Sequence, residues 1–435
     1  MELLIISWII FGVFYIAILH FQGTLSIYNP VILLFIIVLI FGVGKIVYLY
    51  YFASPYYLKL NLVDGSFEKL NYATLVSYLF MFSVVAGSSF FTAPSYHTQT
   101  LSKRDIHYSG DNKLGVLTIG VIISISLFAL LIFFISTGDF TIVSAKRFLG
   151  NGANPSERLG STIYILFKVI QISEIAFYLS FFFYLIGSEK YNKIWLVFSL
   201  ISLGIVVLNA ILFSSRASLL ILLIDIFLIY SIVKKKIDYK IIISAALFFA
   251  LFMLITVLRH QAYGVEKSLL DSLFGGRYFA DIAKQGVILE SLNNFSYSLD
   301  YSSISNFITS YMNIGRFVGM EIFKHEELSG VPMGIMAEMY WIGGLGAVIS
   351  FGVFLGLMYK IVFLLLTKST IHMYMLLILV FIYSRSVVFL TNNGLGVTIY
   401  QIGTDVIVLT VFALITLKSK LELKYIMNFL PKLRP

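Results

Sequence analysis

Four charged side chains are predicted to lie at one depth of a membrane, on four different helices. Arg216 begins one apolar segment, Arg259 ends a second, Arg385 lies near the end of a third, and Glu338 follows the start of a fourth. Ionisable residues within membrane spans are costly, and they usually mark functional sites. The planar fork of arginine matches two phosphate oxygens at once, so three arginines at this depth favour binding of a phosphate-bearing lipid headgroup. For each arginine alone, a long side chain that simply reaches the headgroups from a helix end is an equal alternative.

Glu338 and His260 are the candidate general bases, because a carboxylate or an imidazole can accept the proton of a hydroxyl group. His325 and the Glu326-Glu327 pair are further candidates in the same polar interval, although a solvated loop histidine is the commoner case. The sequence has no cysteine, no zinc-ligand spacing, no phosphate-binding glycine loop and no nucleophile elbow. The sequence therefore predicts either catalysis that needs no metal or cofactor, or no catalysis.

Membrane-spanning helices must position these residues. The chain has 435 residues, of which 59% are hydrophobic and 12% charged, far from the composition of soluble domains. About 20 apolar residues cross a bilayer. We therefore expect an all-α, polytopic helical bundle with about eleven spans (roughly ten to twelve), forming a single membrane domain over residues 1–435. The apolar runs lie near residues 2–19, 30–52, 70–91, 114–136, 161–186, 192–213, 217–233, 240–258, 335–366, 371–390 and 399–417.

Glycines mark two features of the ninth run. Residues 333–342 are predicted to form a separate re-entrant or tilted piece if the helix breaks at Gly343-Gly344-Leu345-Gly346. Further along, Gly352-x-x-x-Gly356 has the spacing of closely packed membrane helices, a common and weak signal that Gly315-x-x-x-Gly319 shares.

Lysine and arginine in the short connections predict the orientation, because cytoplasmic loops keep the excess. One alternating set of connections holds sixteen of these residues and the other holds six. The long interval 259–332 then faces the outside, and the basic tail 418–435 is cytoplasmic. Eleven spans would place the N-terminus outside. This distribution also accounts for most of the net charge of +9, so nucleic acid is not implied as a partner.

The interval 259–332 is a long extracytoplasmic loop rich in aromatic residues. Near residues 304–322, apolar side chains recur at helical spacing. The pattern predicts an amphipathic helix, which either lies at the outer membrane interface or packs on the bundle as a lid.

Several segments together resemble the Wzy-type O-antigen and oligosaccharide repeat-unit polymerases. They are Asn29-Pro30, Ser214-Ser215-Arg216, the long loop after Arg259, and Pro332-Met333-Gly334-Ile335-Met336-Ala337-Glu338-Met339-Tyr340 followed by Gly343, Gly346 and Gly356. The resemblance covers most of the chain in layout and is specific only around residues 214–216 and 330–356. It implies a bacterial inner-membrane glycosyltransferase whose fold is similar to that of GT-C-like, lipid-linked-sugar transferases. The implied donor is a growing glycan on undecaprenyl pyrophosphate, and the implied acceptor is the next lipid-linked repeat unit.

The resemblance also implies roles for individual residues. Arg216 and Arg259 would bind the pyrophosphate. Arg385 is added to them by its predicted depth, not by the resemblance. Arg277 is less securely placed, because the Arg-x10-Gly pattern of some members does not appear in the loop. Glu338 or His260 would accept the hydroxyl proton, and the tyrosines Tyr278, Tyr301 and Tyr340 would form platforms for sugar rings, although packing explains them equally well. A chain-length regulator and a flippase of the same pathway are possible partners.

Three other functions remain open from the sequence. An O-antigen ligase shares the donor and uses a histidine of the large outer loop, a role that His325 could take. A flippase or secondary transporter of lipid-linked glycans should carry its key charges near the bilayer midplane, whereas here they gather at the outer end. A non-enzymatic scaffold would leave the arginines without a purpose.

Overall fold

The fold is described from a computed structural model. The described residues are 2–22, 25–26, 28–62, 67–90, 105–107, 112–137, 165–166, 168–186, 191–212, 216–234, 250, 269–274, 281–292, 302–303, 306, 317–322, 333–367 and 370–416.

Ten helices within these residues are long and apolar enough to cross a membrane. The chain is therefore a multi-pass membrane protein, and the predicted all-α helical bundle is confirmed. The run at 240–258, the eighth of the eleven predicted spans, lies outside the described residues except for residue 250. The ten helices are α1 (Glu2–Phe21), α2 (Pro30–Tyr51), α4 (Glu68–Ser89), α5 (Asn112–Thr137), α8 (Ser173–Ile186, within the span Lys168–Ile186), α9 (Asn192–Leu212), α10 (Arg216–Lys234), α15 (Ile335–Leu366), α16 (Met373–Asn393) and α17 (Leu395–Thr416).

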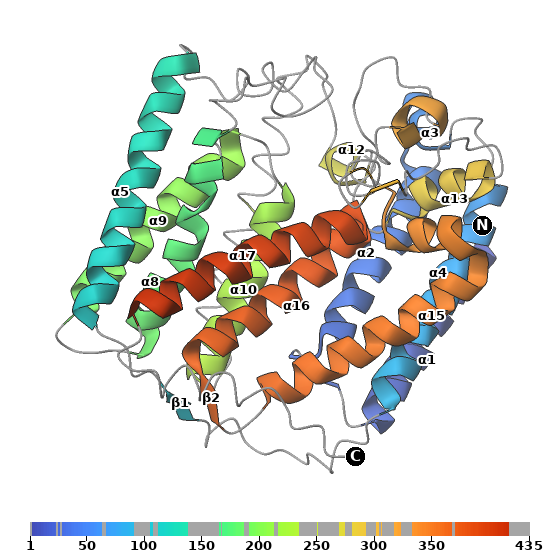
Figure 1. The fold of residues 1–435 in the computed structure, drawn as a ribbon. Helices are drawn as coiled ribbons and strands as arrows, with labels where there is room; N and C mark the ends of the chain where they lie inside the picture. Colours follow the sequence, from blue (N-terminus) through green and yellow to red (C-terminus); the bar gives the residue numbers. More distant parts are fainter. Residues whose placement is uncertain are drawn as a thin grey trace. The chain divides into compact units, whose positions relative to one another are not determined.

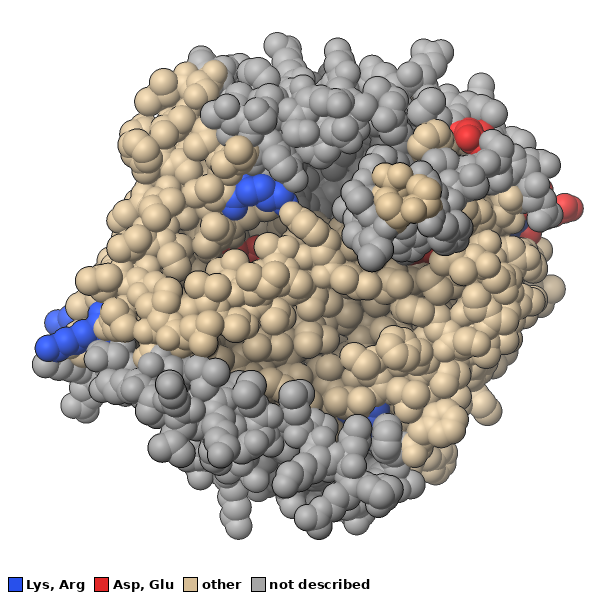
Figure 2. Space-filling view, in the orientation of Figure 1, with Lys and Arg blue, Asp and Glu red and all other residues tan. Residues whose placement is uncertain are grey.

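The surface agrees with this assignment. On the face shown in Figure 2, uncharged residues cover most of the described surface, and Lys, Arg, Asp and Glu are few. Large apolar side chains of α1, such as Ile9, Ile10 and Val13, are exposed. Exposing such side chains to lipid costs no free energy, whereas exposing them to water does.

Figure 1 labels these helices and the shorter elements described below. The chain divides into two compact units. The first comprises Met1–Thr98, Tyr263–Thr367 and Tyr383–Gln401, and the second comprises the remaining residues. The first unit includes three short helices, α3 (Pro55–Leu62), α12 (Leu269–Phe274) and α13 (Ile282–Ser291). The second includes a parallel strand pair that was not predicted, β1 (Asp105–His107) with β2 (Thr370–His372), in which Ile106 lies opposite Ile371. The single membrane domain over residues 1–435 stays a prediction.

Helix α15 is broken where the glycines predicted it. Gly343 (φ −161°, ψ 30°) and Gly344 (φ 62°, ψ −154°) are non-helical, and the backbone of Gly344 is one that other residues rarely adopt. The whole element has 32 residues, about 48 Å as a straight helix, which exceeds the hydrocarbon thickness of about 30 Å. Residues 345–366 alone reach about 33 Å and can span the membrane. The piece before the break, which carries Glu338, is therefore free to take a direction of its own.

Helices α4 and α15 pack closely through glycines, as Gly352-x-x-x-Gly356 predicted. A Cβ atom on Gly356 would overlap the carbonyl oxygen of Val84, and one on Gly352 would lie 2.7 Å from the Cβ of Ser83. A Cβ atom on Gly87 of α4 would likewise overlap the carbonyl oxygen of Val353 in α15. No hydrophobic driving force joins helices in lipid, so van der Waals packing at such close contacts holds them together.

Gly356→Ala is expected to destabilise the first unit by about 1–3 kcal/mol, because the new methyl group forces two backbones apart. Gly346→Ala is the matched control on the same helix, since no atom lies within 4 Å of the added Cβ. Thermal unfolding of the purified protein in detergent measures both. Equal midpoints for the two variants would show that the glycine contact does not hold α4 and α15 together.

The remaining loop predictions are covered only in part. In the predicted amphipathic helix 304–322, the structure describes residue 306 and residues 317–322, with a single π-helical turn over Val318–Ile322. The predicted basic tail 418–435 lies outside the described residues.

Candidate functional site

Three of the predicted site residues have described side chains: Glu338, Tyr340 and Arg385. Arg216 is the first residue of α10, which agrees with its predicted place at the start of a span, but its side chain lies outside the described part. Arg259, His260, Arg277, Tyr278 and Tyr301 lie outside the described residues altogether.

Glu338 is buried and holds the start of another helix. Its side chain is only 3% exposed, and its Oε2 accepts a hydrogen bond of 2.9 Å from the backbone N–H of Leu395. Leu395 begins α17, and a helix N-terminus favours a negative charge and an acceptor for its unpaired N–H groups. Gly394 has φ +88°, and a Cβ there would overlap the Glu338 carboxylate. The carboxylate thus occupies space that the Cβ of any other residue at position 394 would fill.

Lys284 of α13 brings a positive charge to the same turn. Its Nζ donates to the carbonyl of Asn392 at 3.5 Å, near the C-terminal end of α16, where a cation is favoured. Its side chain is completely buried. Lys284 and Glu338 therefore stabilise the turn Asn392–Leu395 with opposite charges. No role for Lys284 was predicted from the sequence, although the polar pair Lys284-Gln285 between Ala283 and Gly286 was a usable signal.

Gln285 connects α13 to the segment that precedes Glu338. Its Nε2 donates to the carbonyl of Met333 at 2.8 Å, and its Oε1 accepts from the N–H of Ala337 at 3.1 Å. Gly334 lies between them with φ +74°, where a Cβ would come within 2.7 Å of Gln285 Nε2 and 3.0 Å of the Thr391 carbonyl. We call this arrangement the junction, defined by Lys284, Gln285, Gly334, Glu338 and the turn Asn392–Leu395.

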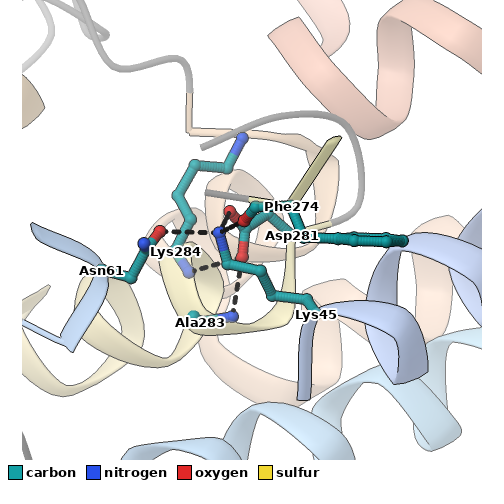
Figure 3. Close-up of polar contacts among 6 residues, drawn as sticks. All are labelled: Lys45, Asn61, Phe274, Asp281, Ala283 and Lys284. Carbon is teal, nitrogen blue, oxygen red and sulfur yellow. Dashed lines mark hydrogen bonds and ion pairs between the residues drawn. The ribbon is translucent and has the colours of Figure 1, made fainter. Parts of the chain in front are cut away.

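A buried ion pair fixes the start of α13 (Figure 3). Lys45 of α2 lies 3.2 Å from Asp281, and both side chains are 2% exposed. The Lys45 Nζ also donates to Asn61 Oδ1 at 2.7 Å and to the carbonyl of Phe274 at 2.5 Å. Asp281 in turn caps α13 by accepting from the N–H groups of Ala283 and Lys284.

This cluster was not predicted from the sequence. Lys45 stands within the second apolar run, and a charge within a span is by itself a reason to look for a partner. In Figure 3 the Lys284 side chain points away from the ion pair, consistent with its contact at the α16–α17 turn. The cluster therefore serves the junction through the placement of α13.

Tyr340 pairs with Tyr72 of α4. The Tyr72 hydroxyl donates to the Tyr340 hydroxyl at 2.7 Å, and the rings meet edge to face with centroids 6.0 Å apart. Tyr340 is half-buried. Packing thus explains part of its role, and its remaining exposed surface lies on the short helical piece that carries Glu338.

Arg385 lies farther from the end of its helix than the sequence predicted. Helix α16 continues to Asn393 rather than ending near residue 390, so Arg385 is about 12 Å from the helix end. Its side chain is 2% exposed, and its Nη1 donates to Ser384 Oγ at 3.0 Å. The adjacent Tyr383 donates to the carbonyl of Asn29 at 3.4 Å, and Asn29 caps α2 through Val31. The Asn29-Pro30 segment therefore has a structural role as a helix start.

The structure describes three groups of the predicted site separately: the Glu338 carboxylate, the Tyr72–Tyr340 pair and the buried Arg385 guanidinium. Within the described ranges, no group of three His, Cys, Asp or Glu side chains is arranged to hold a metal ion. A carboxylate can accept a proton, and a guanidinium can bind an anion. Comparison of the chain with protein-family models, with curated proteins and with solved structures gives no match.

Proposed function

We propose that this protein polymerises undecaprenyl-pyrophosphate-linked oligosaccharide repeat units at the outer face of the bacterial inner membrane. The observation that carries the proposal is the placement of Glu338. It lies at the start of a membrane span, in the segment 332–340 that resembles the Wzy-type polymerases, and it is buried against the α16–α17 turn. A carboxylate so placed is suited to accept a proton where a lipid-linked sugar meets the membrane surface.

The predicted orientation supports an outward-facing site. Lysine and arginine counts assign the C-terminal end of α2, the start of α4, the start of α15 and the long loop to the outer side. In the first unit these parts meet: Lys45 pairs with Asp281, Lys69 pairs with Glu290 at 2.8 Å, and Tyr72 pairs with Tyr340. These contacts bring the four parts together at one end of the first unit. That this end faces outward rests on the lysine and arginine counts alone.

The proposed reaction transfers the glycan from its lipid carrier to a hydroxyl of the next repeat unit. The acceptor oxygen bonds to the anomeric carbon of the donor, the bond from that carbon to undecaprenyl pyrophosphate breaks, and the acceptor proton passes to a base. Glu338 is the proposed base, through Oε1, since Oε2 holds the N–H of Leu395. His260 is the alternative base.

Charge that develops on the leaving pyrophosphate must be stabilised. We assign this role to Arg216, Arg259 and Arg385, with Arg277 as a further candidate, because preorganised cations stabilise a leaving anion at no reorganisation cost. Tyr340, Tyr278 and Tyr301 are the proposed sugar platforms. The proposed partners are the two lipid-linked glycans, together with the flippase and chain-length regulator of the same pathway.

Reconstitution tests the proposal. The full-length protein in nanodiscs is mixed with lipid-linked repeat units extracted from cells that lack this gene. We expect glycans of two and more repeat units on the lipid, with release of undecaprenyl pyrophosphate. Transfer of glycan to added lipid A core without elongation would indicate a ligase instead, and no transfer to either acceptor would contradict both enzymes.

Arg385→Lys is expected to slow elongation in this assay by about 10–100-fold, because lysine keeps the charge but loses the two-pronged contact with phosphate. Arg216→Lys and Arg259→Lys should have similar effects. Lys193→Arg, at the start of α9 on the predicted cytoplasmic side, is the control exchange and should elongate normally. A normal rate for Arg385→Lys at equal protein level would remove Arg385 from the site.

A further inference from the structure

Helix α13 is buried although it belongs to the long loop. Every residue from Ile282 to Leu289 is buried. Its two ends are tied to spans, by Asp281 to Lys45 of α2 and by Glu290 to Lys69 of α4. In between, a Cβ on Gly286 would lie 2.7 Å from the carbonyl of Lys69, so the backbones of α13 and α4 nearly touch. The helix is thus built into the first unit rather than lying on it.

Gln285 occupies the middle of this helix and reaches the turn before Glu338. Its side-chain amide donates one hydrogen bond to the carbonyl of Met333 and accepts another from the N–H of Ala337. Gln285 is 1% exposed, so water cannot replace either bond without opening the structure. Loss of the amide would leave two buried backbone groups unpaired next to Glu338.

We propose that Gln285 is a positioning residue through which α13 holds the short helical piece before the break, and with it the Glu338 carboxylate, against the α16–α17 turn. The long loop then helps to build the site instead of only covering it. The catalytic part of this inference rests on the proposed function of Glu338. The placement of the segment does not rest on it and can be tested alone.

The placement is tested by thiol labelling. The chain has no cysteine, so Met339→Cys introduces a single thiol next to Glu338, at a position only 7% exposed. Adding Gln285→Met, which keeps the side-chain volume but removes both bonds, should raise the rate of maleimide labelling in nanodiscs about tenfold, because the segment opens more often. Adding Glu290→Gln instead is the control, since it disrupts the other end of α13 and leaves the Gln285 bonds in place. An unchanged labelling rate with Gln285→Met would overturn the inference.

The link to Glu338 is tested by a double-mutant cycle on elongation at equal protein level. If Gln285 acts by placing the Glu338 carboxylate, Gln285→Met should slow the wild-type protein about tenfold but slow a Glu338→Asp variant by less than threefold, because the shorter carboxylate is already misplaced. General destabilisation would give equal factors in both backgrounds, and that outcome would overturn the positioning role. Labelling needs no catalysis, so a protein that elongates nothing would refute the proposed function while the labelling result still decides the placement.

Discussion

Glu338→Gln is expected to reduce glycan elongation by about 10²–10⁴-fold while leaving the fold intact. The amide oxygen of glutamine can still accept the N–H of Leu395, which Glu338 Oε2 accepts at 2.9 Å. The amide cannot take the proton of an acceptor hydroxyl. The substitution therefore separates the proposed chemical role of the side chain from its structural role at the start of α17.

The elongation rate in nanodiscs and the thermal midpoint in detergent, measured on the same preparations, give the answer. Glu338→Ala is the companion variant, because it removes both roles and should also destabilise the protein by about 0.5–2 kcal/mol, as loss of a helix cap does. If Glu338→Gln elongates at the wild-type rate, Glu338 is a helix cap only, and His260 becomes the base to examine.

Lys45→Met should cause the largest loss of stability, about 3–5 kcal/mol, because it leaves the Asp281 carboxylate buried without its cation. Both side chains are 2% exposed and 3.2 Å apart, so water cannot replace the lysine. Thermal unfolding in detergent measures the effect. Lys69→Met is the matched control, since its partner Glu290 is 57% exposed and an exposed pair contributes only about 0–1 kcal/mol.

Combining Lys45→Met with Asp281→Asn should restore much of the lost stability. Asparagine removes the unpaired charge and remains a good cap for α13, where Asp281 now accepts from Ala283 and Lys284. If Lys45→Met unfolds no earlier than Lys69→Met, the ion pair does not anchor α13.

The sequence predicted those features that depend on local signals. The length of the apolar runs predicted the described spans, and two adjacent glycines predicted the break at Gly343-Gly344. The small residues Gly352 and Gly356 predicted a close helix contact, which the structure places at α4. Each of these is encoded within one stretch of chain. Their physical causes, burial of the backbone in lipid and the absence of a Cβ, do not depend on which partner helix arrives.

Contacts between distant segments could not be predicted in this way. The bond of Glu338 to Leu395 spans 57 positions, that of Gln285 to Met333 spans 48, and that of Lys45 to Phe274 spans 229. Each requires the packed bundle to bring its partners together. A buried lysine within a span signals that a partner exists, and Lys45 shows that this signal deserved use, but the sequence does not name the partner.

The most direct test of the proposed function is the glycan ladder of cells with this gene deleted and restored, run beside their lipid-linked intermediates. We predict that deletion leaves core with a single repeat unit and no ladder, and that the wild-type gene restores the ladder whereas Glu338→Gln at equal protein level does not. Full-length polymer retained on undecaprenyl pyrophosphate would contradict polymerisation and indicate a ligase. Repeat units trapped on the cytoplasmic leaflet would contradict it in favour of a flippase, and an unchanged ladder would exclude all three.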